Sequence, residues 1–292
     1  QIKEQAYQEL AQVIRPLSDL ETARQIQSLA AKFTRQVQSL KEAQANYQRE
    51  LHELEGRQSN SIQALHHSLS RLSQSTYTVT GKQGGFLGMG GTAFEVSFNM
   101  VPIPDKNYEI SETQVTQELY EAVMGSNPSH FKGAKLPVEE VSWKDGIAFC
   151  NALSKKLGLT PAYKGTNNNC ELVSGANGFR LPFEAEWEFA AKGGQNFKYA
   201  GSDNIDEVAW YGNNSDRKTY DVAKKRSNGY GLYDMSGNVW EWCADDYDNP
   251  GQHRLGASKR ASRGGSWLRN GAVFCEVSGR GRRSPGSRSR LL

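Results

Sequence analysis

Cysteine pairs, histidine pairs and long apolar runs are all scarce in this sequence, and each shortage excludes a class of protein. The four cysteines, at positions 150, 170, 243 and 275, form no C-x-x-C motif and have no zinc-like spacing. They are interpreted as buried small side chains or as an incidental disulfide. The five histidines include no H-x-x-x-H pair, so no iron site of two histidines and a carboxylate is visible. No apolar run approaches the roughly eighteen residues that a membrane-spanning helix needs.

The charge is mild overall and concentrated near the C-terminus. The 292 residues carry a formal net charge of +3, and 23% of them are charged. With a mean hydropathy of -0.68, the composition is typical of soluble proteins with room for two domains. Between positions 263 and 292 the one acidic residue is Glu276, and the arginines are Arg263, Arg269, Arg280, Arg282, Arg283, Arg288 and Arg290. Such a basic segment suits an acidic partner.

Residues 1–78 have the composition of helices, rich in Gln, Glu, Ala, Leu and Lys. Between positions 26 and 54 the apolar residues recur every seven residues on two ladders. The ladders are Ile26, Phe33, Leu40, Tyr47 and Leu54, and Ala30, Val37, Gln44 and Leu51. So narrow a stripe must pair with another helix, which predicts a helical stalk that self-associates or a helical hairpin. Breaks are predicted at 16–19 and at 56–61, which would give two or three helices.

Residues 79–292 have a different composition, in which Gly, Asn, Trp, Tyr and Pro are frequent and periodicity is rare. Helices are predicted at 115–124 and at 143–157, the second with Ser142 as its N-cap. A short helix is predicted after Pro182, with two glutamates in its first turn. Strands are predicted at 93–98 and 239–243. The rest is expected to be loops held by aromatic side chains.

Five stretches of this second segment carry a resemblance to a known family. They read QVTQELYEAVMGSNPS at 114–129, LPVEEVSWKDGIAFCNALSKKLG at 136–158, FRLPFEAEWEFAAKGG at 179–194, NGYGLYDMSGNVWEWCADDY at 228–247 and RGGSW at 263–267. From about Phe94 onward, the sequence resembles the formylglycine-generating-enzyme, or sulfatase-modifying-factor, family. The resemblance implies an α+β fold, with a C-type-lectin-like domain at 79–292 preceded by the α-helical, coiled-coil-like segment at 1–78.

The stretch DMSGNVWE places a carboxylate among apolar residues. In a strand, alternation sends Glu241 to the same face as Val239 and Cys243, and such a carboxylate needs a cation or hydrogen-bond donors. The resemblance implies a structural calcium ion, held by the side chains of Asp234 and Glu241 and by the carbonyl groups of Gly237 and Val239. Alternatively, Glu241 accepts hydrogen bonds from arginine or from backbone N–H groups.

The cysteine pair that the enzymes of this family use is not present. These enzymes oxidise a cysteine of a client protein with two thiols placed shortly after the RGGS(F/Y/W) motif, whereas this stretch reads WLRNGAVFCE and holds Cys275 alone. One thiol cannot form a two-thiolate copper site. The related iron-dependent sulfoxide synthases rely on a His-rich site. We therefore expect no catalytic residue and no redox cofactor, with a formylglycine-generating-type or sulfoxide-synthase-type oxidase as the alternative.

Residues 263–292 resemble the variable region of diversity-generating-retroelement proteins, a branch of the family that includes treponemal surface lipoproteins. The fixed frame of that region reads RGGSW, followed by Arg280, Pro285 and Arg288. The interleaved positions follow no rule of helix, strand or core, and the resemblance implies that they vary and bind ligand. These candidate positions are Leu268, Arg269, Asn270, Val273, Phe274, Gly279, Gly281, Arg282, Ser284, Gly286, Ser287, Ser289, Arg290 and Leu291.

A terminus rich in Arg, Gly and Ser is also typical of a disordered tail or of a segment that binds nucleic acid. Residues such as Trp267, Phe274 and Val277 are too apolar for a solvated tail, and the mild net charge argues against nucleic acid. We therefore expect a non-catalytic, surface-displayed protein whose variable region recognises a protein or another surface macromolecule. The resemblance implies a place on the outer membrane, with membrane contact only through a lipid anchor on a cysteine before Gln1.

Overall fold

A long helix and a mixed α+β domain make up the protein. The computed structural model describes residues 20–83, 92–165, 169–254, 256–268 and 271–290. The chain divides into two compact units, Gln1–Ile62 and Gln63–Leu292. Among the described residues, none of the helices combines the length and the apolar character that a bilayer crossing requires.

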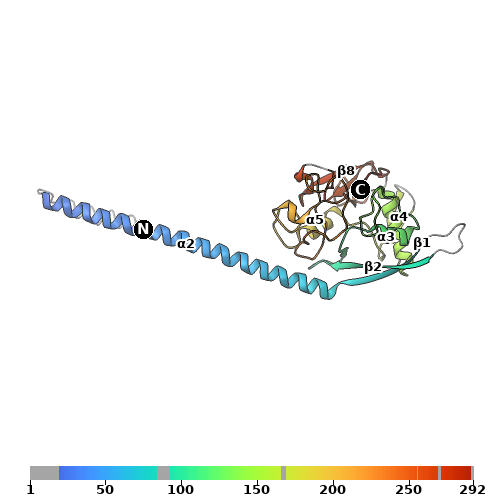
Figure 1. Ribbon diagram of the computed structural model, residues 1–292, viewed down its shortest axis with the longest axis horizontal. Helices are drawn as coiled ribbons and strands as arrows, with labels where there is room; N and C mark the ends of the chain where they lie inside the picture. Colours follow the sequence, from blue (N-terminus) through green and yellow to red (C-terminus); the bar gives the residue numbers. More distant parts are fainter. Residues whose placement is uncertain (1–19, 84–91, 166–168, 255, 269–270, 291–292) are drawn as a thin grey trace. The chain divides into compact units, whose positions relative to one another are not determined.

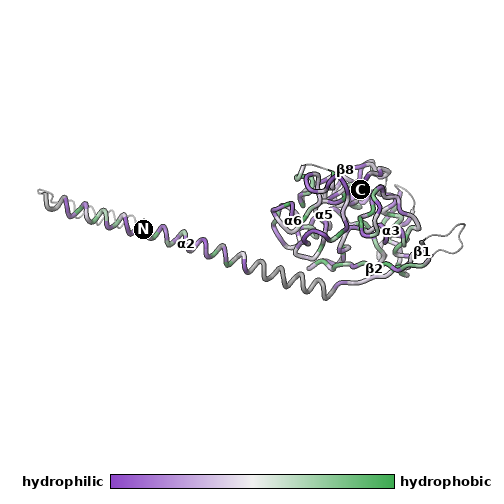
Figure 2. The backbone as a smooth tube through the Cα atoms, viewed as in Figure 1, coloured by the Kyte–Doolittle hydropathy of each residue, from purple (hydrophilic) through white to green (hydrophobic). Residues whose placement is uncertain are grey.

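Helix α2 runs without interruption over Leu20–Ser73 (Figure 1). The predicted break at 56–61 is wrong, because a glycine inside a helix costs only about 1 kcal/mol relative to alanine, which the surrounding helix-forming residues offset. The other predicted break, at 16–19, lies outside the described residues. The apolar ladder is exposed on this helix, with Leu40 65%, Tyr47 63% and Leu54 60% accessible. Figure 2 shows short green, apolar intervals on a helix that is otherwise mostly hydrophilic.

An antiparallel sheet opens the second unit. Its strand order is β1-β2-β3, with β1 at Ser75–Gln83, β2 at Thr92–Pro102 and β3 at Glu109–Ser111. Strand β1 pairs with β2 along its whole length, from Ser75 opposite Met100 to Gln83 opposite Thr92. The sheet therefore begins slightly before position 79, where the sequence predicted the second domain to start.

The two predicted helices are confirmed as α3 at Gln117–Met124 and α4 at Trp143–Lys156. Helix α3 packs on β1 and β2 and on α4. Ser142 caps α4 as predicted, because its hydroxyl accepts from the Asp145 N–H while the Asp145 carboxylate accepts from the Ser142 N–H. The predicted short helix is α5 at Glu184–Lys192.

The remaining elements are short and are joined by loops. They are β4 at Tyr163–Lys164, β5 at Glu171–Leu172, α6 at Ile205–Val208, β6 at Glu241–Asp246, β7 at Arg260–Arg263, η2 at Ala272–Cys275 and β8 at Arg280–Arg283. Strands β6, β7 and β8 form a second antiparallel sheet in that order. Helix α5 lies against β6 and β7.

Buried aromatic residues fill the core between these elements. Trp143 and Trp187 are fully buried, and the Trp143 indole N–H donates to the Cys243 carbonyl at 3.0 Å. Alternation along β6 is confirmed, since Trp242 joins the cluster around Trp143 whereas Cys243 joins the cluster around Trp187. All four cysteines are buried, as one of the two interpretations predicted.

Candidate ligand-binding site

The C-terminal segment, residues 263–290, begins at the last residue of the buried strand β7 and includes the partly exposed strand β8. All four residues of β7 are buried between β6 and β8. In β8, which pairs with β7, Arg280 and Arg282 are exposed and Gly281 and Arg283 are half-buried. Figure 1 shows this red part of the chain gathered on one side of the second unit.

Two frame arginines anchor this segment on helix α5. Arg263, only 3% exposed, forms ion pairs with Glu184 at 2.8 Å and with Glu188 at 2.5 Å, and donates to the carbonyls of Val277 and Gly279. Arg280 binds both carboxylate oxygens of Glu184, at 2.5 and 2.7 Å. Because bidentate, charge-assisted pairs fix geometry as well as distance, they hold β7 and β8 in one position.

The RGGSW motif is buried and packs closely against side chains and main chain of the domain. A Cβ on Gly265, whose φ is 77°, would lie 2.6 Å from the Cys275 Sγ, so only glycine fits there. The Trp267 N–H donates to the Asn238 carbonyl, and the Trp267 carbonyl accepts from the Ser215 hydroxyl. The Trp267 indole N–H donates to the Arg290 carbonyl at 2.8 Å, so the motif also holds the end of the segment.

The end of the segment is fixed a second time near the start of α4. The Glu140 N–H donates to the Ser289 carbonyl at 3.0 Å, and Arg288 forms an ion pair with Asp145 at 2.8 Å. Pro285 is buried. All the frame residues predicted from the sequence therefore contact the scaffold through main chain, buried side chains or ion pairs.

None of the described candidate variable positions is buried, whereas residues 263–267 and Pro285 of the frame are. Leu268 is 40%, Val273 56% and Phe274 37% exposed, although large apolar side chains are usually buried. The other described positions that are exposed are Arg282, Ser284, Gly286 and Arg290, and those that are half-buried are Gly279, Gly281, Ser287 and Ser289. Arg269, Asn270 and Leu291 lie outside the described residues.

Gly279 and Gly281 are more constrained than the other candidate positions. A Cβ on Gly279 would lie within 2.9 to 3.1 Å of three carbonyl oxygens, and one on Gly281 would lie 2.5 Å from the Ser262 hydroxyl. These two positions tolerate a side chain only if the frame moves, so in this structure they belong with the frame. Gly286, by contrast, has no atom within 4 Å of an added Cβ.

Three of the four predicted calcium ligands, the carbonyls of Gly237 and Val239 and the carboxylate of Glu241, lie near one point, but a side-chain amide occupies that point. The Gln114 Nε2 lies 3.3 Å from the Gly237 carbonyl, 2.9 Å from the Val239 carbonyl and 2.9 Å from the Glu241 Oε1. It also lies 3.2 Å from the main-chain carbonyl of Asp234. The Asp234 carboxylate instead accepts from the Ala223 N–H at 2.8 Å.

This arrangement does not fit a calcium ion as it stands. Calcium takes six to eight oxygen ligands at about 2.3 to 2.6 Å, and an ion here would have to displace the Gln114 amide. Burial raises the pKa of Asp234 to about 6 and that of Glu241 to about 7, and hydrogen bonds from Gln114 and Trp187 to Glu241 offset part of the second shift. The donors to Glu241 are thus side chains, neither the arginine nor the backbone N–H groups that the sequence suggested.

Cys275 is buried beneath Gly265 in a cluster with Tyr199, Val208 and Tyr211. Burial raises the pKa of its thiol to about 12, so the thiolate that nucleophilic or metal-binding chemistry needs is disfavoured. Within the ranges that the structure describes, no three His, Cys, Asp or Glu side chains are arranged to hold a metal ion.

Sequence reasoning missed the partners that hold the frame. Glu184 and Glu188 are four residues apart and therefore share one face of α5, which could have indicated a pairing with arginine. Gln114 carried no comparable signal, because it meets residues more than a hundred positions away.

The fold and this segment define a C-type-lectin-like domain of the formylglycine-generating-enzyme type. Residues 69–292 match the family described as "Sulfatase-modifying factor enzyme 1-like domain". The chain belongs to this family.

Relatives of several kinds share this fold. The solved structure of Treponema denticola variable protein 1 is 36% identical, with a TM-score of 0.60 over 75% of this chain and 96% of that chain. The "Chaperone protein LppX" of Paenibacillus barcinonensis is 40% identical over 61% of this chain and 76% of the relative. The mouse "Inactive C-alpha-formylglycine-generating enzyme 2" is 32% identical over 46% of this chain and 38% of the relative. The family therefore includes inactive members. The likeness of this chain to a variable protein fits a non-catalytic role.

Proposed function

We propose that this protein binds macromolecular ligands, without catalysis, through a diversified surface formed by its C-terminal segment. The observation that carries the proposal is the contrast, within the described part of residues 263–290, between anchored frame residues and the exposed side chains of Leu268, Val273 and Phe274. A main chain ordered before the ligand arrives lowers the ordering cost of binding.

The exposed side chains suit a protein ligand. Leu268, Val273 and Phe274 offer apolar anchors, and Arg282 and Arg290 offer charge-assisted hydrogen bonds. The likeness to a variable protein supports variation at these positions. The likeness to a chaperone protein supports a polypeptide as the ligand, because chaperones act on other proteins.

Display on the outer membrane through a lipid anchor, and self-association through helix α2, belong to the same proposal. The exposed ladder of α2, which includes Phe33, Val37 and Leu40, supports the second part. Several copies joined by their helices would present several binding surfaces at once and would raise avidity for a repetitive surface.

A selection experiment tests the proposal. The full chain is randomised at Leu268, Val273, Phe274, Arg282, Ser284, Gly286 and Arg290, displayed on yeast and selected against lysozyme as a test ligand. Folded binders whose substitutions lie at these positions are expected. A matched library at exposed positions of β2, such as Thr92, Ala93 and Glu95, should yield none. Loss of folding in the first library, or equal yields from the two, would overturn the proposal.

A further inference from the structure

A cavity of about 460 Å³ lies inside the second unit. Its lining comes mainly from the sheet β1-β2-β3, from α3 and α4, and from residues 176–182 and 235–242, and no described residue of 263–290 is part of it. Exposed residues on its lining, Asn107, Glu109 and Asn177, show where it reaches the solvent. Its volume lies within the range of about 300 to 1,000 Å³ that is typical of small-molecule sites.

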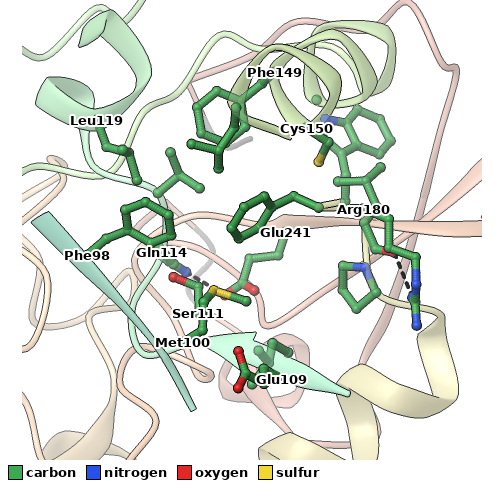
Figure 3. A pocket seen from close by; sticks show the side chains of 18 of the residues that line it. Phe98, Met100, Glu109, Ser111, Gln114, Leu119, Phe149, Cys150, Arg180 and Glu241 are labelled. Atoms are coloured by element: carbon green, nitrogen blue, oxygen red, sulfur yellow. Dashed lines mark hydrogen bonds between the residues drawn. The ribbon is translucent and has the colours of Figure 1, made fainter. Parts of the chain in front are cut away.

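Aromatic rings form much of the wall. Tyr77, Phe98 and Phe179 are half-buried and contact one another, with ring centroids 5.3 to 5.8 Å apart. Tyr120 and Phe149 also line the cavity and stack on each other at 5.4 Å. Figure 3 shows Phe98 and Phe149 facing the cavity from different elements. Such walls favour apolar ligands, and ring faces also attract cations.

The charges on the lining are predominantly negative. Three carboxylates, Glu109, Glu186 and Glu241, face one guanidinium, that of Arg180. Arg180 is already engaged, since it donates to both oxygens of Glu186 at 2.7 Å. Within the described part of the chain, Glu109 and Glu241 therefore have no cationic partner.

Of these carboxylates, Glu241 gives the clearest indication of what the cavity binds. It is half-buried, and its two oxygens accept from the neutral groups of Gln114 and Trp187, each at 2.9 Å. A carboxylate has about four acceptor positions, so it can accept further donors. A half-buried carboxylate whose hydrogen-bond donors are neutral is costly in free energy, and a ligand that brings a positive charge lowers that cost.

We propose that this cavity binds a small hydrophobic amine, with the ammonium group on Glu241 and the apolar part against the aromatic wall. Glu109, an exposed carboxylate on the lining, adds to the attraction for a cation. This site does not depend on the variable surface, and the two proposals can fail separately.

Calorimetric titration of the full chain with two matched probes tests the site. The probes are 4-phenylbutylamine and 4-phenylbutanol, which have the same apolar part and differ in the charged group. The amine is expected to bind at least about tenfold more tightly, the ratio that a charge-assisted hydrogen bond of about 1.5 kcal/mol gives. Glu241→Gln should remove that preference and leave alcohol binding within about threefold, because its neutral amide oxygen still accepts a hydrogen bond.

Two further variants separate binding from folding. Glu95→Gln, at an exposed position of β2 that does not line the cavity, should bind the amine like the parent protein. Ala176→Phe, which enlarges a residue on the wall, should weaken both probes. Equal affinity for the two probes, no saturable binding of either, or amine binding that survives Glu241→Gln would overturn the proposal. So would loss of amine binding in calcium chloride, since Glu241 would then belong to an ion site.

Discussion

Helix α2 and the C-terminal segment both expose large apolar side chains, but they support them differently. In α2 the exposed residues, such as Leu40 and Tyr47, recur with a helical period on a main chain that is stabilised by its own hydrogen bonds. In the C-terminal segment the exposed residues Leu268, Val273 and Phe274 do not recur at a regular spacing. There the main chain is held by side chains of the frame, through contacts such as the ion pair of Arg263 with Glu184 and the hydrogen bond from Trp267 to Arg290.

The difference indicates two kinds of partner. A periodic stripe is complementary to another helix with the same period, so we propose a second copy of α2 as its partner. An aperiodic set on an anchored main chain matches no such repeat, and under the proposed function its side chains are expected to change without loss of the fold. Four experiments test this difference: on the anchoring glutamate Glu184, on the buried Cys275, on the apolar ladder of α2 and on the 234–241 loop.

The largest effect is expected at the anchor. Glu184→Ala leaves the guanidinium groups of Arg263 and Arg280 without their shared carboxylate, and breaking a buried pair costs about 3 to 5 kcal/mol. Urea unfolding measures this change. Glu171→Ala is the matched control, because its partner Lys164 is exposed, and it should cost less than about 1 kcal/mol. Similar losses from the two variants would mean that the anchors do not hold the segment.

Cys275 beneath the surface should be nearly inert. With its pKa raised from 9.0 to about 12, the thiolate fraction at mildly alkaline pH falls about a thousandfold. Because the folded thiol ionises at a higher pH than the unfolded thiol, its contribution to stability is lost as pH rises above about 9. Iodoacetamide labelling followed by mass spectrometry should find Cys275 unmodified in the folded protein and modified in denaturant. Fast labelling of the folded protein, or formylglycine formed in a cysteine peptide, would favour the oxidase alternative.

On the helix, Leu40→Glu combined with Tyr47→Glu should abolish self-association of the full chain. Each substitution puts a charge in the apolar seam, whereas Ser39→Glu with Ala45→Glu places the same charges off the ladders and should leave the assembly intact. Light scattering coupled to size-exclusion chromatography gives the mass. A parent protein that is monomeric at high concentration would show that the stripe has another partner.

Calcium should have the smallest effect. Because the Gln114 amide already donates to the oxygens of the 234–241 loop, the melting temperature in EDTA should match that in calcium chloride within about 2 °C. Differential scanning calorimetry makes this comparison. A clear rise with calcium would show that the ion displaces Gln114, as the family resemblance implied.

Local signals predicted the fold better than the contacts between its parts. The N-cap at Ser142 and the short helix after Pro182, with two glutamates in its first turn, depend on residues a few positions apart, and the structure confirms them. The continuity of α2 through Gly56 was missed, because one weak residue does not end a long helix.

For the site, the sequence indicated which residues form the frame but not what holds them. The pairing of Arg280 with Glu184 spans 96 positions, and that of Gln114 with Val239 spans 125, so neither leaves a local pattern. The cavity is less predictable still, since its walls come from strands, helices and loops spread over residues 77–242. The constraint on Gly279 and Gly281 also became visible only through the neighbours that a Cβ would meet.

A crystal structure of one multiply substituted variant tests the central claim most directly. The variant carries Leu268→Ser, Val273→Asp, Phe274→Ser, Arg282→Glu and Arg290→Ser, which change charge and size at exposed positions and leave the frame intact. The main chain of residues 263–268 and 271–290 should superpose on that of the parent protein within about 1 Å. A segment that refolds along another path, or that has no electron density, would contradict it.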